Sequence, residues 1–202
     1  MAITNGYTTL AEVKAALRIP SADTIDDSLL EMAIESASRL LDGYTARSFY
    51  SSGTAVARYF AADNDFICQI DDAVSISEVA TDFSADGSYD TIWTATDYEL
   101  LPLNGRVDGL AVPYNGLRAI QDYTFPYLNG EGLVKVTGIW GWSAVPIAVR
   151  QACIIQSSRI FKRLDSPLGV LSSPDLGFMR VGSKLDPDVA QLVDPYKIVR
   201  FA

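Results

Sequence analysis

Histidine is absent from all 202 residues of the chain. It is the usual general base near neutral pH, the usual activator of a serine or cysteine nucleophile, and a frequent zinc ligand. Its absence removes hydrolases of the Ser-His-Asp and Cys-His types and most zinc enzymes. We therefore expect no catalytic residues, no metal ligands and no cofactor.

Basic residues are also scarce. Lysine and arginine total 16, against 25 aspartates and glutamates, so the net charge is −9. Proteins that hold nucleic acid usually carry a basic face, whereas the few basic residues here are scattered. We expect the chain to repel DNA phosphate rather than to bind it.

Long apolar runs are missing as well. None approaches the roughly 18 residues that a membrane helix needs, and the first residues lack the pattern of a secretory signal. We expect a soluble protein that is made in a cytoplasm and has no membrane contact. The two cysteines, Cys68 and Cys153, are far apart, so we expect free thiols, with Cys153 as a small buried apolar residue.

The first 50 residues carry helix signals. Thr9 and Glu12 form a capping box, and Pro20 is expected to end the helix that follows. Thr24 is expected to cap a longer helix. Its small and apolar positions follow helical spacing: Ile25, Leu29, Met32, Ala33, Ser36, Leu40 and Tyr44, widened by Leu30, Ile34, Ala37 and Leu41.

Residues 51 to 140 contain a series of dipeptides that favour tight turns, including Asn104-Gly105, Asp108-Gly109 and Asn115-Gly116. Short β-branched and aromatic segments lie between them. The expected strands are 55–61, 66–70, 74–80, 91–94, 98–101, 107–112, 117–122 and 133–140. Such a series predicts an antiparallel β sandwich or barrel.

After this region, Pro146 is expected to open a helix that is apolar on nearly every side before it turns basic near Arg163. A helix of this kind must be covered by its own domain or by a neighbouring subunit. A last short helix is expected to begin at Pro187. The predicted fold is α+β: residues 1–50 and 141–202 form a helical core, and residues 51–140 form an inserted β domain.

Two further segments are unusually apolar. The stretch 164–184 is too long and too apolar for a simple connection, and the tail 196–202 alternates apolar with polar residues. We expect both to contact other subunits or partners. The candidate interface residues are Leu168, Val170, Leu171, Phe178, Met179, Tyr196, Ile198, Val199 and Phe201.

Other patterns admit a chemical interpretation but favour a structural one. Residues 177–184 resemble a phosphate-binding loop, but they end in Ser-Lys where the motif has Lys-Ser or Lys-Thr, and they lack its preceding strand and following helix. Asp63, Asn64 and Asp65 lack EF-hand spacing and suit a turn. The three tryptophans could line a carbohydrate site, although strand aromatics usually pack in a core.

Several motifs together point to a known family. They are Gly138, Gly141, Trp142, Val145 and Pro146 with the helix that follows, the opening helices at 7–17 and 25–42, and the segments 178–189 and 192–196. In these segments the chain resembles the head-to-tail adaptors of tailed phages, which are also called head-completion or connector proteins.

This resemblance implies a structural virion protein that forms a ring of about twelve copies under the portal. The ring would join capsid to tail, extend the DNA channel without specific DNA binding, and present its other face to a stopper or tail-completion protein. The protein would be made in the cytoplasm of a bacterial host and reside in the virion.

Two other functions remain open from the residues alone. One is a carbohydrate- or ligand-binding β module on a helical scaffold. The other is a glycoside hydrolase that uses only carboxylates, which would need two opposed acids in one cleft.

Overall fold

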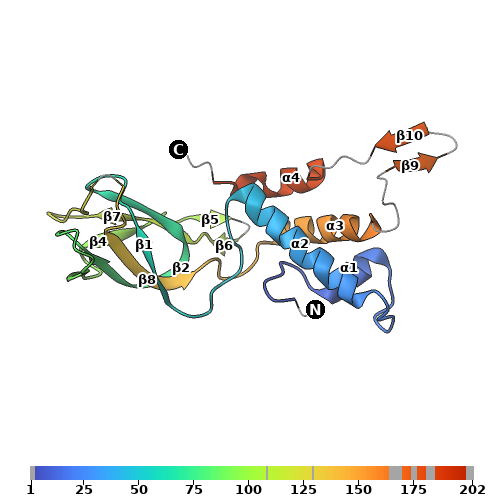
Figure 1. The fold of residues 1–202 in the computed structure, drawn as a ribbon, viewed down its shortest axis with the longest axis horizontal. Helices are drawn as coiled ribbons and strands as arrows, with labels where there is room; N and C mark the ends of the chain where they lie inside the picture. The colour runs from blue at the N-terminus through green and yellow to red at the C-terminus, as the bar shows by residue number, and fades with distance from the viewer. Residues whose placement is uncertain are drawn as a thin grey trace. The chain divides into compact units, whose positions relative to one another are not determined.

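The computed structural model describes residues 3–107, 109–128, 130–163, 170–173, 177–180 and 185–198, with the backbone alone at 170–173 and 177–180. The chain divides into two compact units. Unit 1 combines Met1–Arg47 with Val145–Ala202, and unit 2 is Ser48–Ala144. Unit 1 is mainly helical and unit 2 is a β structure (Figure 1), so the predicted α+β class is confirmed.

The helices of unit 1 pack around α3. Helix α2 lies against α3, α4 packs on α3, and α1 contacts both α2 and α3. Their bounds are α1 Leu10–Leu17, α2 Asp27–Thr45, α3 Ile147–Lys162 and α4 Pro187–Val193, followed by a 3-10 turn at Asp194–Tyr196.

Helix α1 begins with the predicted capping box. The Thr9 hydroxyl accepts from the Glu12 N–H, and the Glu12 carboxylate accepts from the Thr9 N–H at 2.9 Å. These bonds hold the Glu12 pKa below its usual value, chiefly through the backbone bond from Thr9. The helix ends at Leu17, and its C-cap residue Arg18 lies in the left-handed region at φ 59°, two residues before Pro20.

Thr9→Ala should destabilise unit 1 by about 1 kcal/mol, because it removes one partner of the first-turn N–H groups. Thermal unfolding followed by far-UV circular dichroism measures the change. Thr9→Ser keeps the hydroxyl and is expected to retain most of the stability. An equal loss in both variants would contradict the capping role.

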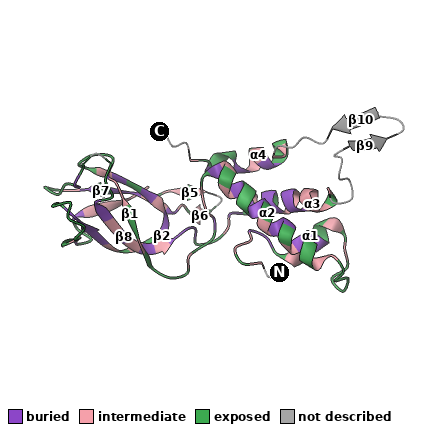
Figure 2. Ribbon diagram, in the orientation of Figure 1, coloured by how far each residue is buried: buried purple, intermediate pink, exposed green. Residues whose placement is uncertain are grey.

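Helix α2 differs from the prediction in two ways. It begins at Asp27 after an N-cap, Asp26, that makes no side-chain cap bond, so Thr24 is not the cap. Its buried face is formed by the positions that were expected merely to widen the stripe, including Leu30, Ile34 and Leu41. Figure 2 shows the two sides of the helix as bands of different burial.

The main sheet of unit 2 is antiparallel throughout. In the described residues its order is β1-β8-β2-β7-β4, with β3 beside β2. Because β1 and β4 are open edges, the barrel alternative is wrong. The bounds are β1 Val56–Phe60, β2 Ile67–Thr81, β3 Thr91–Trp93, β4 Tyr98–Leu101, β7 Tyr114–Ala119 and β8 Val134–Trp140, with β5 Arg106–Val107 and β6 Leu110–Ala111 as a separate two-stranded pair.

Strand β2 joins the two halves of the sheet. Its first half pairs with β7 and its second half with β8 and β3, with register shifts between Gln69 and Ala73 and again near Ile76. The predicted strands 66–70 and 74–80 are therefore one bulged strand. Both halves share one core, in which Trp93 stacks on Phe125 at a ring distance of 4.6 Å.

One predicted turn is wrong. Asn115 and Gly116 lie inside β7, where Gly116 is opposite Gln69 on one side and Leu101 on the other. Gly109, by contrast, does lie between β5 and β6, and it has a positive φ of 77°. The Asn115-Gly116 pair is part of a strand because it has pairing partners on both sides.

The end of β8 forms a tight corner. The Gly141 N–H donates to the Asp72 carbonyl at 2.7 Å, and the Gly141 φ is 101°. A Cβ at this position would lie 1.8 Å from the Tyr50 carbonyl oxygen, so no side chain fits. The buried Trp142 then donates its indole N–H to the Asp72 carboxylate at 3.0 Å and packs beside Phe49.

A second hairpin lies within the segment expected to be an apolar loop. Strands β9 (Val170–Ser173) and β10 (Gly177–Arg180) pair antiparallel, with Val170 opposite Arg180. This pairing satisfies backbone groups that a plain loop would leave to solvent. The sequence had not indicated strands in this segment, and the structure places two at these eight positions.

Candidate assembly surface

The carboxylates that could suggest chemistry serve local structure instead. Asp63, Asn64 and Asp65 form a turn in which the Asn64 side chain accepts from the Phe66 and Ile67 N–H groups, and the Asp63 carboxylate accepts from the Gln69 N–H. Over the described residues, no group of three or more His, Cys, Asp or Glu side chains could hold a metal ion. The turn interpretation explains this acidic cluster.

All three tryptophans are buried, as the packing interpretation predicted. Trp93 donates to the Thr81 hydroxyl at 2.9 Å, and Trp140 donates to the Val56 carbonyl at 2.7 Å. With Trp142, they are at most 5 % exposed. None of the three indoles offers a face for stacking a sugar or a base.

Both cysteines are free and buried, in different units. Burial raises the pKa of the Cys68 thiol to about 12, and burial also raises the Cys153 pKa. A thiol held protonated and out of solvent is a poor nucleophile. Cys153 packs against the Ser38 hydroxyl between α3 and α2, as the sequence predicted for a small buried residue.

Unit 2 contains one shallow hollow relevant to the ligand-binding alternative. Its volume is about 390 Å³, and its lining includes Pro102, Leu103, Val112 and Tyr114. Arg106 is the one charged residue in the described lining. A single exposed guanidinium beside apolar groups does not define a ligand class.

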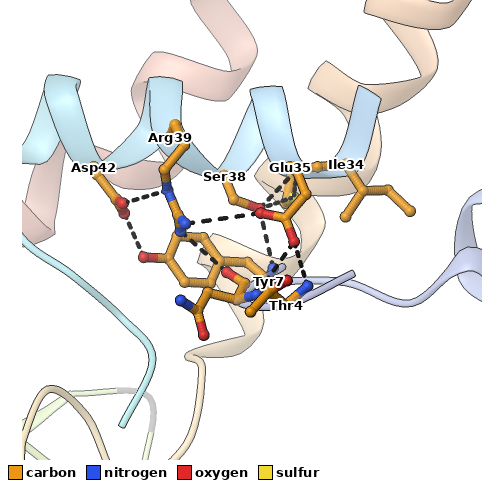
Figure 3. A network of polar contacts seen from close by, with 9 residues as sticks. Thr4, Tyr7, Ile34, Glu35, Ser38, Arg39 and Asp42 are labelled. Atoms are coloured by element: carbon orange, nitrogen blue, oxygen red, sulfur yellow. Dashed lines mark hydrogen bonds and ion pairs between the residues drawn. The ribbon is translucent and has the colours of Figure 1, made fainter. Parts of the chain in front are cut away.

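The N-terminal arm covers one flank of α2. The Glu35 carboxylate accepts from the Thr4 N–H, the Ser38 hydroxyl accepts from the Tyr7 N–H at 3.1 Å, and the Tyr7 hydroxyl donates to Asp42. Figure 3 shows these residues converging along α2, with Arg39 between Glu35 and Asp42. Burial raises the Asp42 pKa, although Tyr7 and Arg39 oppose the shift.

The outer face of α2 is apolar and uncovered in unit 1. Leu29 is 41 % exposed, Met32 52 % and Leu40 49 %, and Ile25 just before the helix is 87 % exposed. The neighbouring positions Leu30, Ile34 and Leu41 are fully buried. Helix α2 is therefore apolar on two sides, one turned into the core of unit 1 and one turned out.

Helix α3 combines a buried face with an exposed start. Val149, Ala152 and Cys153 are buried, whereas Ile147 is 71 % exposed. Pro146 stands at the N-cap, one position before the helix it was expected to begin. Unit 1 therefore covers one face of α3, and it leaves Ile147 at the start of the helix exposed.

The C-terminal segment is fixed to the end of α2. The Tyr44 hydroxyl donates to Asp194 at 2.6 Å, and the Ile198 N–H donates to the Thr45 carbonyl at 2.9 Å. The Tyr44 pKa is raised, chiefly by this bond to Asp194. Tyr196 is only 4 % exposed, so it belongs to the packing of unit 1.

The candidate interface residues from the sequence therefore fall into three groups. Tyr196 is buried and Ile198 is partly buried, both within unit 1. Val170 and Leu171 lie on β9, and Phe178 and Met179 on β10, where the backbone alone is described. Leu168, Val199 and Phe201 lie outside the described residues. The exposed face of α2 was absent from that set, although its helical spacing was visible in the sequence.

No helix in the described ranges has the length and apolar character to cross a bilayer.

Comparison with protein families identifies residues 7–81 as similar to the phage gp6-like head-tail connector proteins. This match includes α1, α2, β1 and the whole of β2. The resemblance to head-to-tail connectors, first seen in motifs at both ends of the chain, is confirmed over this part. No curated protein matches the chain.

Solved structures of similar fold cover the whole chain. One is from the neck of an empty GTA particle computed with C6 symmetry, with a TM-score of 0.59 and 16% identity over 100% of this chain and 95% of that one. The neck of the native GTA particle computed with C12 symmetry gives 0.59 at 17% identity, covering 100% and 94%. A chain of the native gene transfer agent virion gives 0.59 at 19%, covering 100% and 95%. At these identities the likeness concerns the fold.

Proposed function

We propose that this chain is a structural virion protein that joins head and tail in a phage-type particle. The observation that carries the proposal is the agreement between the connector family over residues 7–81 and a fold shared along the whole chain with neck proteins. The burial of the three tryptophans and the turn role of Asp63 and Asn64 account for two of the features that could otherwise suggest sugar binding or a metal site.

The protein works as a ring of about twelve copies. Neck structures of similar fold were computed with C6 and C12 symmetry, which supports this copy number. A closed ring requires two different complementary surfaces on each subunit. With a charge of −9 per copy, such a ring repels DNA phosphate and lets DNA pass without adhering.

The partners of the ring are the portal on one side and a stopper or tail-completion protein on the other. The C-terminal residues after Ile198 bind the portal by adding a strand to it. Two features support this assignment: the alternating sequence of the tail, and the anchoring of residues 194–198 to the end of α2, which fixes where the tail leaves the unit. The protein is made in the cytoplasm of the bacterial host.

Deletion of residues 199–202 should abolish binding to the portal and leave the unfolding temperature unchanged. The cut spares Tyr196, which is buried, and Ile198, whose N–H is bonded to Thr45. A longer deletion from 196 would instead remove a buried aromatic ring and destabilise unit 1 by about 3–5 kcal/mol.

Co-sedimentation with the portal protein of the same particle measures the binding. Val199→Thr, which keeps a β-branched residue at the first deleted position, is the control and should still bind. Full portal binding by the 199–202 deletion variant would contradict the role of the tail. It would not contradict ring formation, which is a separate claim.

A further inference from the structure

Three loops of unit 2 gather at the end of its sheet that lies away from β5 and β6 (Figure 1). They are residues 61–66, 82–90 and 120–133. The first and third loops are joined by the Phe125 N–H, which donates to the Asp65 carbonyl at 2.7 Å. The second and third are joined by the Tyr89 hydroxyl, which donates to the Gly132 carbonyl at 2.6 Å. We call these three loops the loop end of unit 2.

The loop end exposes a group of large apolar side chains. Each of them is between 41 % and 57 % exposed, and they are Phe66, Phe83, Tyr123, Tyr127 and Leu128. Aromatic side chains are enriched in the centres of protein–protein interfaces, and gathered apolar groups on a protein surface mark a contact with another molecule. The loop end is therefore a candidate docking surface.

The same loops carry negative charge and no positive charge. Their exposed carboxylates belong to Asp63, Asp65, Asp86, Asp90, Asp122 and Glu131, and the three loops contain no Lys or Arg. Three of the four basic residues of unit 2 are paired with carboxylates of the strands instead: Arg58 with Asp71, Arg118 with Glu99, and Lys135 with Glu78. The fourth, Arg106, lies on β5. The apolar side chains of the loop end are thus framed by carboxylates that no cation of these loops neutralises.

The charge of the whole chain limits what can cover this surface. Unit 2 holds 13 of the 25 acidic residues and 4 of the 16 basic ones, which leaves 12 of each in unit 1. The entire net charge of −9 therefore resides in unit 2. Another copy of unit 2 would repel the loop end, and unit 1 offers no excess of positive charge. DNA phosphate is repelled as well, so a basic protein surface is the complementary partner.

The proposed function leaves one partner without a binding surface. It assigns the portal to the C-terminal tail of unit 1, whereas the loop end belongs to unit 2. Resting on that function, we propose that the loop end docks the stopper or tail-completion protein, through a face of that protein on which Lys and Arg surround apolar residues. Opposite charges steer the encounter, and the buried aromatic side chains hold the complex.

Neutralising the loop end tests the electrostatic part of this contact. Asp122→Asn with Glu131→Gln, in rings assembled on the portal, should weaken binding of the purified stopper or tail-completion protein about tenfold at low salt. The difference should shrink at about 1 M salt, where charges are screened. Asp23→Asn with Asp188→Asn removes the same charge from exposed positions of unit 1 and is the matched control, which should bind like wild type. Co-sedimentation over a range of stopper concentrations measures the affinity.

An apolar-to-polar change tests the centre of the surface. Tyr127→Gln, at a residue 57 % exposed, should weaken the same binding at least about fivefold. Leu103→Gln, at a residue 58 % exposed outside the three loops, is the matched control and should leave binding unchanged. Both side chains are already exposed, so both variants should keep the fold.

The outcomes separate this proposal from the function on which it rests. Wild-type affinity in both the charge variant and Tyr127→Gln would overturn the docking surface and leave the proposed function standing. Loss of portal attachment in these variants would also overturn it, because the loop end would then face the portal. Wild-type rings that bind no stopper or tail-completion protein would overturn the proposed function itself.

Discussion

Leu41→Ala is expected to destabilise unit 1 by about 2–5 kcal/mol. Leu41 is fully buried in the face of α2 that belongs to the core of unit 1, so truncation leaves a cavity. The same change at Leu40, which is 49 % exposed, should alter the free energy of unfolding by no more than about 0.5 kcal/mol. These two adjacent leucines therefore separate the buried face of α2 from its exposed apolar face.

Two optical signals locate the effect. All three tryptophans lie in unit 2, so their fluorescence follows that unit, whereas far-UV circular dichroism of the helices follows unit 1. Leu41→Ala should lower the dichroism transition far more than the fluorescence transition. Equal losses of stability for Leu40→Ala and Leu41→Ala would contradict the two-faced description of α2.

Gly141→Ala is expected to destabilise unit 2 by at least about 3 kcal/mol. The new Cβ would lie 1.8 Å from the Tyr50 carbonyl oxygen, and the backbone φ of 101° is itself unfavourable for alanine. Relief requires moving the backbone of the corner, which also carries the bond from the Gly141 N–H to Asp72 and the buried Trp142.

Gly87→Ala is the matched control, because Gly87 also has a positive φ, of 89°, but faces open space. It should cost about 1–2 kcal/mol for the backbone conformation alone. Tryptophan fluorescence in a urea titration measures both variants. A Gly141→Ala variant no less stable than Gly87→Ala would show that the close approach to Tyr50 does not constrain the corner.

Local signals in the sequence were sufficient for much of the helical unit. The capping box at Thr9 and the start of α4 at Pro187 depend on residues that are close in the sequence, and both predictions are confirmed. Which face of α2 is buried was not predictable in this way. Both faces of α2 are apolar, so the choice depends on where α3 and α1 pack, and those contacts are distant in the sequence.

The β unit shows the same division. Short apolar segments identified most strands, but Asn115 and Gly116 were mistaken for a turn because their strand pairing with β2 and β4 is non-local. The single continuous β2 was also not predicted, because the register shift between Gln69 and Ala73 coincides with the gap between the predicted strands 66–70 and 74–80.

The interface residues named from the sequence remain a prediction. The segments 164–184 and 196–202 were selected because they are unusually apolar. Tyr196, however, is buried in its own unit. The sequence alone does not distinguish an apolar residue that packs within its own unit from one that packs on a partner. The exposure of Leu29, Met32 and Leu40 could be recognised only once the opposite face of α2 was seen to be buried.

Electron microscopy of this protein mixed with its portal tests the central claim most directly. A connector function predicts a ring of about twelve copies attached to one face of the portal and coaxial with its channel, as the symmetry of the similar necks supports. Portal particles that remain bare at saturating concentrations of the folded, full-length protein would contradict a role at the head-to-tail junction.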